Sequence, residues 1–67
     1  MNKNIPTDPY IRVVLKKLVN RPRQLTLRKI EQDTGLNRMW LSLFSRGHID
    51  DPSYTKIVTL DTYLSNQ

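Results

Sequence analysis

The chain contains no cysteine, only two glycines among its 67 residues and no long apolar run. Without cysteine it can form neither disulfides nor thiolate metal sites. No apolar stretch approaches the roughly 18 residues of a membrane-spanning helix. Residues 1–10 carry Pro6, Asp8 and Pro9 and no apolar block, so we expect no secretory signal. We therefore expect a cytoplasmic protein that does not bind membranes.

Enzyme chemistry has little support in the sequence. Two glycines do not supply a glycine-rich phosphate loop. The one histidine, His48, follows Gly47 in a predicted loop with no nucleophile pattern beside it, and a contact to phosphate or solvent suits it better. We expect no catalytic residue, metal, cofactor or small-molecule ligand. A chain of this length forms one small domain with a modest core.

Positive charge is concentrated in the first two thirds of the chain, within a formal net charge of +5. Residues 1–46 hold ten Lys and Arg against three acidic residues, whereas residues 47–67 hold Lys56 against three aspartates. The ten are Lys3, Arg12, Lys16, Lys17, Arg21, Arg23, Arg28, Lys29, Arg38 and Arg46. This asymmetry is typical of proteins that bind a polyanion, although solubility alone also accounts for basic side chains.

The first helix is predicted to begin at Asp8–Pro9, because Asp8 can cap the free amides and proline fits the first helical position. Residues 1–7 lack periodicity and are expected to form a flexible arm. The helix should end near Asn20, since Pro22 disfavours helical geometry in the residue before it. Its apolar stripe consists of Ile11, Val14, Leu15, Leu18 and Val19.

Two shorter helices follow, joined by a tight turn. Thr26 can cap a helix over about residues 27–34, which Gly35 can end in the left-handed conformation. Asn37 can then cap another helix that ends near Arg46–Gly47. Two helices around a glycine turn form the unit that places one helix in the major groove of DNA.

The C-terminal segment is predicted to form a fourth helix over about residues 52–64, with Asp51 as its cap and Pro52 in its first turn. The β-branched run Ile57–Val58–Thr59 makes a strand the alternative. Several apolar residues there exceed the needs of one small core, and they either complete the core or form a dimer contact. They are Ile49, Tyr54, Val58 and Tyr63.

The third helix has two unlike faces at about 100° per residue. Trp40, Leu41 and Phe44 fall on one side and should be buried. The opposite side carries Arg38, Met39, Ser42 and Arg46, with Leu43 at its edge. Arginine can contact guanine O6 and N7 in bidentate fashion, serine can bond several base edges, and methionine or leucine can lie against a thymine methyl. Asn37 is placed to offer its side chain and nearby backbone amides to a phosphate.

At these residues the chain resembles the helix-turn-helix domain of phage repressors and Cro proteins, the XRE-like family. Gly35 holds the ninth of twenty motif positions counted from Leu27, where that family has its turn glycine. Further matches are Ile30, Leu36, Leu41, Phe44, Arg46–Gly47 and Asp51–Pro52–Ser53. The resemblance covers residues 9–64 and implies an all-α, lambda-repressor-like domain of four to five helices.

Two positions depart from the family pattern. The family prefers a small residue at the fifth position, where the two helices cross closely, and this chain has Glu31. Glu31 either reaches sideways to a basic partner such as Arg28 or widens the crossing. Thr34, at the eighth position, is more polar than usual.

The resemblance also implies which residues contact DNA. The base-contact positions correspond to Asn37, Arg38, Met39, Ser42, Leu43 and Arg46. The phosphate clamp corresponds to Leu27, Arg28 and Lys29, to which we add Thr26, Arg21, Arg23 and His48 as candidates. Arg12, Lys16 and Lys17 either extend this track or only solvate the first helix.

We expect a sequence-specific transcriptional regulator of the repressor type. One recognition helix reads only a few base pairs, so a homodimer on a palindromic operator is expected, formed through the C-terminal helix and the Ile49 region. The alternative is a small module that docks on a protein and uses Met39, Trp40 and Leu43 as anchors.

Overall fold

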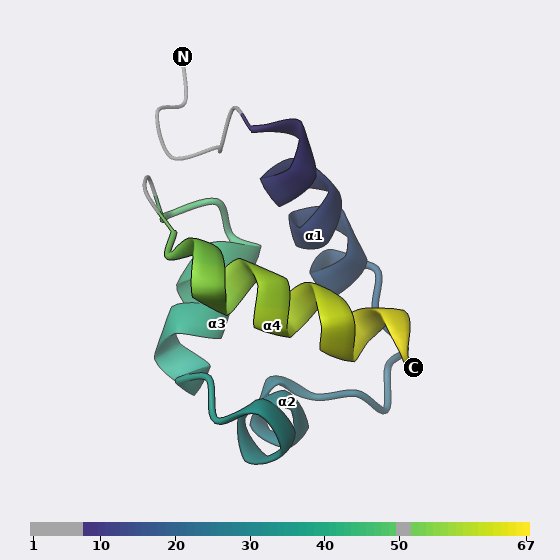
Figure 1. The fold of residues 1–67 in the computed structure, drawn as a ribbon. Coiled ribbons are helices and arrows are strands. Elements are labelled where there is room, and N and C mark those ends of the chain that lie inside the picture. Colours follow the sequence, from purple (N-terminus) through teal and green to yellow (C-terminus); the bar gives the residue numbers. More distant parts are fainter. Residues whose placement is uncertain (1–7, 50–51) are drawn as a thin grey trace.

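The computed structural model describes residues 8–49 and 52–67, and these ranges form α-helices without strands. The helices are α1 (Pro9–Val19), α2 (Leu27–Thr34), α3 (Arg38–Ser45) and α4 (Tyr54–Ser65). α1 packs against α3 and α4, and α2 packs against the same two helices. Figure 1 shows α4 crossing the molecule between α1 and α2. The expected small all-α domain is confirmed. The predicted arm, residues 1–7, lies outside the described residues.

Side-chain caps begin the first three helices at the predicted residues. Asp8 Oδ1 accepts from the Tyr10 amide at 2.8 Å. Thr26 Oγ1 accepts from the Lys29 amide at 3.1 Å, and Asn37 Oδ1 accepts from the Trp40 amide at 3.1 Å. Each cap satisfies one of the amides that lack a partner in the first helical turn.

The start of α4 differs from the prediction. The helix begins at Tyr54 after Ser53, and Pro52 is buried ahead of it rather than in its first turn. Asp51, the expected cap, lies outside the described residues. The strand alternative is wrong, because Ile57 and Leu60 are fully buried at helical spacing. Packing of this face against the core overrides the β preference of the Ile57–Val58–Thr59 run.

The core draws on all four helices and the loops between them. Its buried residues are Val14, Leu18, Leu25, Ile30, Leu36, Leu41, Phe44, Ile57 and Leu60. Val19 was predicted to join them but is 55% exposed, because α1 ends there and the chain turns away after Leu18. None of the helices in the described part of the chain is long and apolar enough to cross a membrane.

Trp40 is only partly buried, where the sequence predicted a core residue. Its ring stacks on Phe44 with centroids 5.1 Å apart and planes 9° from parallel. Lys56 Nζ from α4 lies 5.2 Å from the Trp40 ring centroid. Trp40 thus closes the edge of the core between α3 and α4, with one face covered by Phe44 and a cation within cation–π range.

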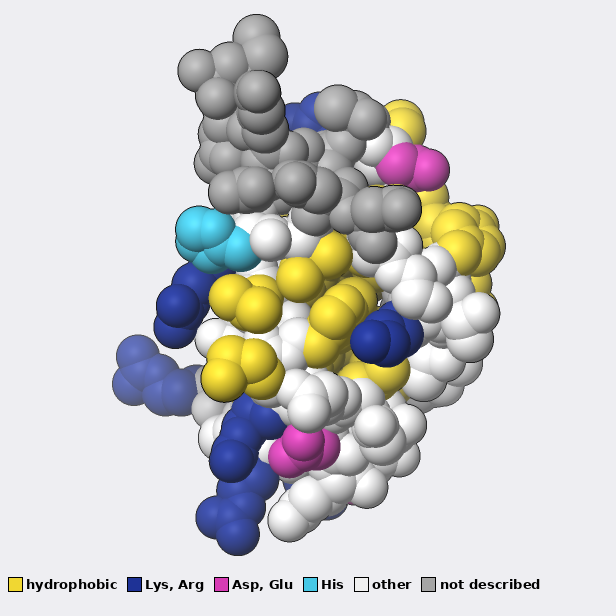
Figure 2. Space-filling view, turned by 90° about the vertical axis from the view of Figure 1, so that its left-hand side faces the viewer, with side chains coloured by type: hydrophobic (Ala, Val, Ile, Leu, Met, Phe, Trp, Pro, Cys, Tyr) yellow, Lys and Arg dark blue, Asp and Glu magenta, His cyan; other side chains and the backbone are white. Residues whose placement is uncertain are grey.

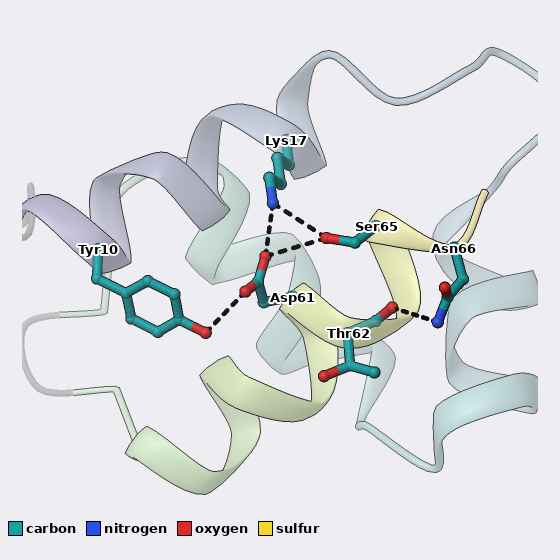
Figure 3. A network of polar contacts seen from close by, with 6 residues as sticks. All are labelled: Tyr10, Lys17, Asp61, Thr62, Ser65 and Asn66. Carbon is teal, nitrogen blue, oxygen red and sulfur yellow. Dashed lines mark hydrogen bonds and ion pairs between the residues drawn. The ribbon is translucent and has the colours of Figure 1, made fainter.

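Asp61 joins α4 to α1 through a polar network (Figure 3). Its carboxylate accepts from the Tyr10 hydroxyl at 2.8 Å and from Lys17 Nζ at 2.7 Å, and Lys17 also donates to Ser65 Oγ at 3.1 Å. The hydrogen bond from Lys17, and to a lesser extent the one from Tyr10, lowers the pKa of Asp61. The bond to Asp61 raises the pKa of Tyr10 to about 12. The network therefore fixes α1 on α4 most firmly while Asp61 is ionised and Tyr10 is protonated.

Candidate nucleic-acid interface

The turn between α2 and α3 is built as the sequence predicts. Gly35 has φ of 80°, a left-handed conformation that ends α2, and Leu36 after it is buried. Thr34, polar for its position, braces this turn: its hydroxyl donates to the Ile30 carbonyl at 2.7 Å and accepts from the Leu36 amide at 3.1 Å. The turn fixes the direction in which α3 leaves α2.

Glu31 makes a contact that was not predicted from the sequence. Its Oε2 accepts from the backbone amide of Arg38, the first residue of α3, at 2.8 Å. The ion pairs among the described residues do not join Glu31 to Arg28. The sideways interpretation was therefore wrong, and the carboxylate instead caps α3 across the turn. A glutamate seven residues before a predicted helix start was the available signal.

The outer face of α3 carries the side chains predicted for it. Arg38, Met39 and Arg46 are exposed, Met39 to 68%, whereas Ser42 and Leu43 are partly buried. Leu41 and Phe44 on the opposite side are fully buried. The predicted orientation of α3 is thus confirmed.

A shallow open groove of about 530 Å³ runs between α2 and the outer face of α3. It is lined by Leu27, Glu31, Asn37, Arg38, Met39, Ser42 and Arg46. The structure therefore brings together the predicted base-contact residues except Leu43, which does not line the groove. Glu31 is the one acidic residue of the lining, and neither the helical wheel nor the resemblance assigned it to this surface.

Charge and apolar surface lie side by side on this part of the molecule. Figure 2 views the side on which α3 lies and shows Lys and Arg side chains projecting along one edge, with hydrophobic side chains gathered next to them. A basic edge beside exposed apolar groups offers both phosphate contacts and contacts to base methyl groups.

Two amides at the N-terminus of α3 already have acceptors within the protein. The Arg38 amide bonds Glu31 and the Trp40 amide bonds Asn37 Oδ1. These amides were expected to lie near a phosphate, and the structure gives them internal acceptors instead. The Asn37 carboxamide nitrogen takes no part in this cap and remains a donor for a ligand.

The predicted phosphate contacts divide into exposed and structural residues. Arg23, Arg28 and His48 are exposed, and Lys29, exposed as well, lies 3.5 Å from Asp33. Arg21 has a structural role that was not predicted. Its Nε donates to the Leu25 carbonyl at 2.6 Å and its Nη1 to the Leu18 carbonyl at 2.9 Å, so it holds the loop between α1 and α2.

The remaining members of the predicted phosphate set lie around the start of α2. Thr26 is exposed and supplies the cap of this helix, while Leu27 is partly buried and lines the groove. On α1, Arg12 and Lys16 are exposed, whereas Lys17 is paired with Asp61. Lys17 thus contributes to the α1–α4 contact, whereas the basic residues of α2, Arg28 and Lys29, directly follow Leu27 of the groove lining in the sequence.

Comparison of the chain with family models, with curated proteins and with solved structures gave no match.

Proposed function

We propose that this protein is a sequence-specific double-stranded DNA-binding regulator whose α3 enters the major groove. The observation that carries the proposal is the outer face of α3. It presents Arg38 and Arg46 with the 68% exposed Met39, on a helix whose direction is fixed by a left-handed glycine and buried Leu41 and Phe44. A rigid helix with arginines on its free side is suited to reading base edges.

Two energy terms would act together. Exposed Arg23, Arg28 and Lys29 neutralise phosphates and release counterions, which gives affinity for any duplex that falls as salt rises. Arg38, Arg46 and their neighbours in the groove then discriminate between bases, each good bidentate pair contributing about 1–3 kcal/mol. Affinity and selectivity are thus assigned to different side chains.

Selectivity would benefit from a homodimer. α4 leaves Tyr54 62% and Val58 40% exposed, and Ile49 is partly buried against the core. Tyr63 is less available, because its hydroxyl donates to Asp33 at 2.5 Å. Two copies joined through Tyr54 and Val58 would present two α3 helices to half-sites about 34 Å apart. Occupation of a promoter by such a dimer, and hence repression, is the simplest output.

A protein-binding module is the second candidate, since the 68% exposed Met39 and the partly buried Leu43 could anchor a partner protein. Arg38 and Arg46 beside them favour DNA, because guanidinium groups suit phosphate and guanine. Salt dependence separates the two functions. Binding through phosphates weakens steeply with salt, whereas an apolar anchor does not.

Selection of bound sequences from a random pool of duplex DNA tests the proposal. We expect enrichment of a short motif, repeated with two-fold symmetry if the protein binds as a dimer. As salt rises from 50 to 200 mM, the dissociation constant for the enriched duplex should increase by about tenfold for every two phosphates contacted. No enrichment, together with salt-independent or absent binding to duplex DNA, would remove the proposal.

A further inference from the structure

Glu31 holds both ends of the turn that leads into the recognition helix. Its backbone carbonyl accepts from the Gly35 amide at 2.8 Å, which closes the last turn of α2. Its carboxylate accepts from the Arg38 amide at 2.8 Å, which opens α3. Glu31 therefore contributes one hydrogen bond on each side of the turn, from its backbone to Gly35 and from its side chain to Arg38.

The carboxylate also occupies an amide donor at a helix end of the kind that binds phosphates. The amides of a helix N-terminus attract anions, and a side-chain carboxylate satisfies them as a phosphate does. Because Glu31 bonds the Arg38 amide from within the protein, that donor is engaged before DNA arrives. Glu31 also lines the groove with Arg38 and Arg46, where its charge opposes phosphate and leaves the arginines for base edges.

We propose that Glu31 is a specificity-determining positioning residue, which fixes α3 on α2 and withholds the Arg38 amide from phosphate. The proposal rests on the DNA-binding function proposed above. The Glu31 side chain thus has two effects. Its hydrogen bond to Arg38 sets the position of the outer face of α3, and its negative charge lowers the affinity for every duplex alike.

Two substitutions divide these effects. Glu31→Gln keeps an oxygen acceptor at the same reach and removes the charge. Glu31→Asp keeps the charge, but its side chain is one methylene shorter and does not reach the Arg38 amide from the same backbone position. Gln32→Ala is the matched control, because Gln32 is an exposed neighbour on α2 outside the groove lining.

The measurement is the ratio of dissociation constants for random duplex and for the selected site, at fixed salt. We expect Glu31→Asp to reduce this ratio about tenfold, comparable to losing one good base contact. Glu31→Gln should tighten binding to both duplexes by about threefold and leave the ratio near that of the wild type. Gln32→Ala should change neither constant. A ratio retained in Glu31→Asp and lost in Glu31→Gln would overturn the positioning role.

Hydrogen exchange of the Arg38 amide in the free protein gives a readout that does not depend on DNA. The amide should be protected in the wild type and in Glu31→Gln, and should exchange faster in Glu31→Asp. Equal exchange in all three proteins would refute the contact itself. The protein could show this order of protection and yet have no affinity for duplex DNA. That result would contradict the proposed function and the role of Glu31 in specificity. The hydrogen bond from the Arg38 amide to Glu31 would still be supported.

Discussion

Lys17 Nζ on α1 lies 2.7 Å from Asp61 Oδ1 on α4, and Tyr10 donates to the other oxygen of the same carboxylate. Asp61→Asn should therefore lower stability by about 1 kcal/mol, in the range of a partly exposed ion pair with an added hydrogen bond. Chemical denaturation of the variant measures the change. An unchanged unfolding midpoint would show that the contact of α1 with α4 depends on apolar packing alone.

Protonation of the Asp61 carboxylate should lower the stability of the fold in acid. The folded-state pKa of Asp61 lies below the ordinary value of 3.8, so its contribution is complete above 3.8 and is lost as pH falls through the lower folded-state pKa. Asp33 acts in the same direction through its bond from Tyr63. Thermal melts between about pH 2 and 5 should show a steeper loss of Tm in the wild type than in Asp61→Asn. Parallel curves would contradict the assignment.

Ionisation of Tyr10 should lower the stability of the fold at alkaline pH, the opposite direction of pH change. Its folded-state pKa is raised to about 12 from 10.0, so the contribution is complete below 10.0 and is lost as pH rises through about 12. Tyr10→Phe removes the phenol and keeps the ring. The bond to Asp33 also raises the pKa of Tyr63. Spectrophotometric titration of the wild type should therefore show two tyrosines that ionise late, and Tyr10→Phe should show one fewer. A variant that retains both late steps would contradict the assignment to Tyr10.

The partial burial of Trp40 sets the size of its contribution. Trp40→Ala removes the ring that stacks on Phe44 at 5.1 Å and lies near Lys56, and should destabilise the domain by about 2–3 kcal/mol, less than a fully buried tryptophan would. Met39→Ala is the control, because Met39 is 68% exposed and should change stability little. Denaturation of both variants tests the orientation of α3. A larger loss in Met39→Ala would mean that the opposite face is buried.

Arg38 and Lys29 should differ in the kind of DNA affinity that they supply. Arg38→Ala should weaken the selected site by about 1–3 kcal/mol and random duplex much less, because the side chain lies on the outer face of α3 that we propose contacts bases. Lys29→Ala should weaken both duplexes similarly and make the salt slope shallower by about one. Binding titrations at several salt concentrations compare the two variants. Equal effects would show that Arg38 contacts only phosphate.

The first three helices and the glycine turn were predictable because their signals are local. Asp8, Thr26 and Asn37 each cap a helix within three residues of their own position, and Gly35 ends α2 through its backbone conformation. The apolar periodicity of α3 likewise placed Leu41 and Phe44 in the core. Such signals depend on spacing along the chain, which the sequence displays directly.

The contacts between helices were not predictable in this way. Arg21 bonds two backbone carbonyls, Glu31 bonds an amide across the turn, and Asp61 bonds α1 from the far end of the chain. Each of these side chains is polar and flexible, and its partner depends on how the helices pack. The partial exposure of Trp40 has the same origin, since the helical wheel gives its side but not how far α4 covers it.

A titration of the isotope-labelled protein with its selected duplex, followed by backbone amide NMR, tests directly whether α3 binds DNA. We expect the largest shift changes on residues 37–46 and on the start of α2 at residues 27–29, with little change at the α1–α4 contact around Tyr10 and Asp61. Shift changes centred on α1 or on the α1–α4 contact, with α3 unaffected, would contradict DNA binding by α3.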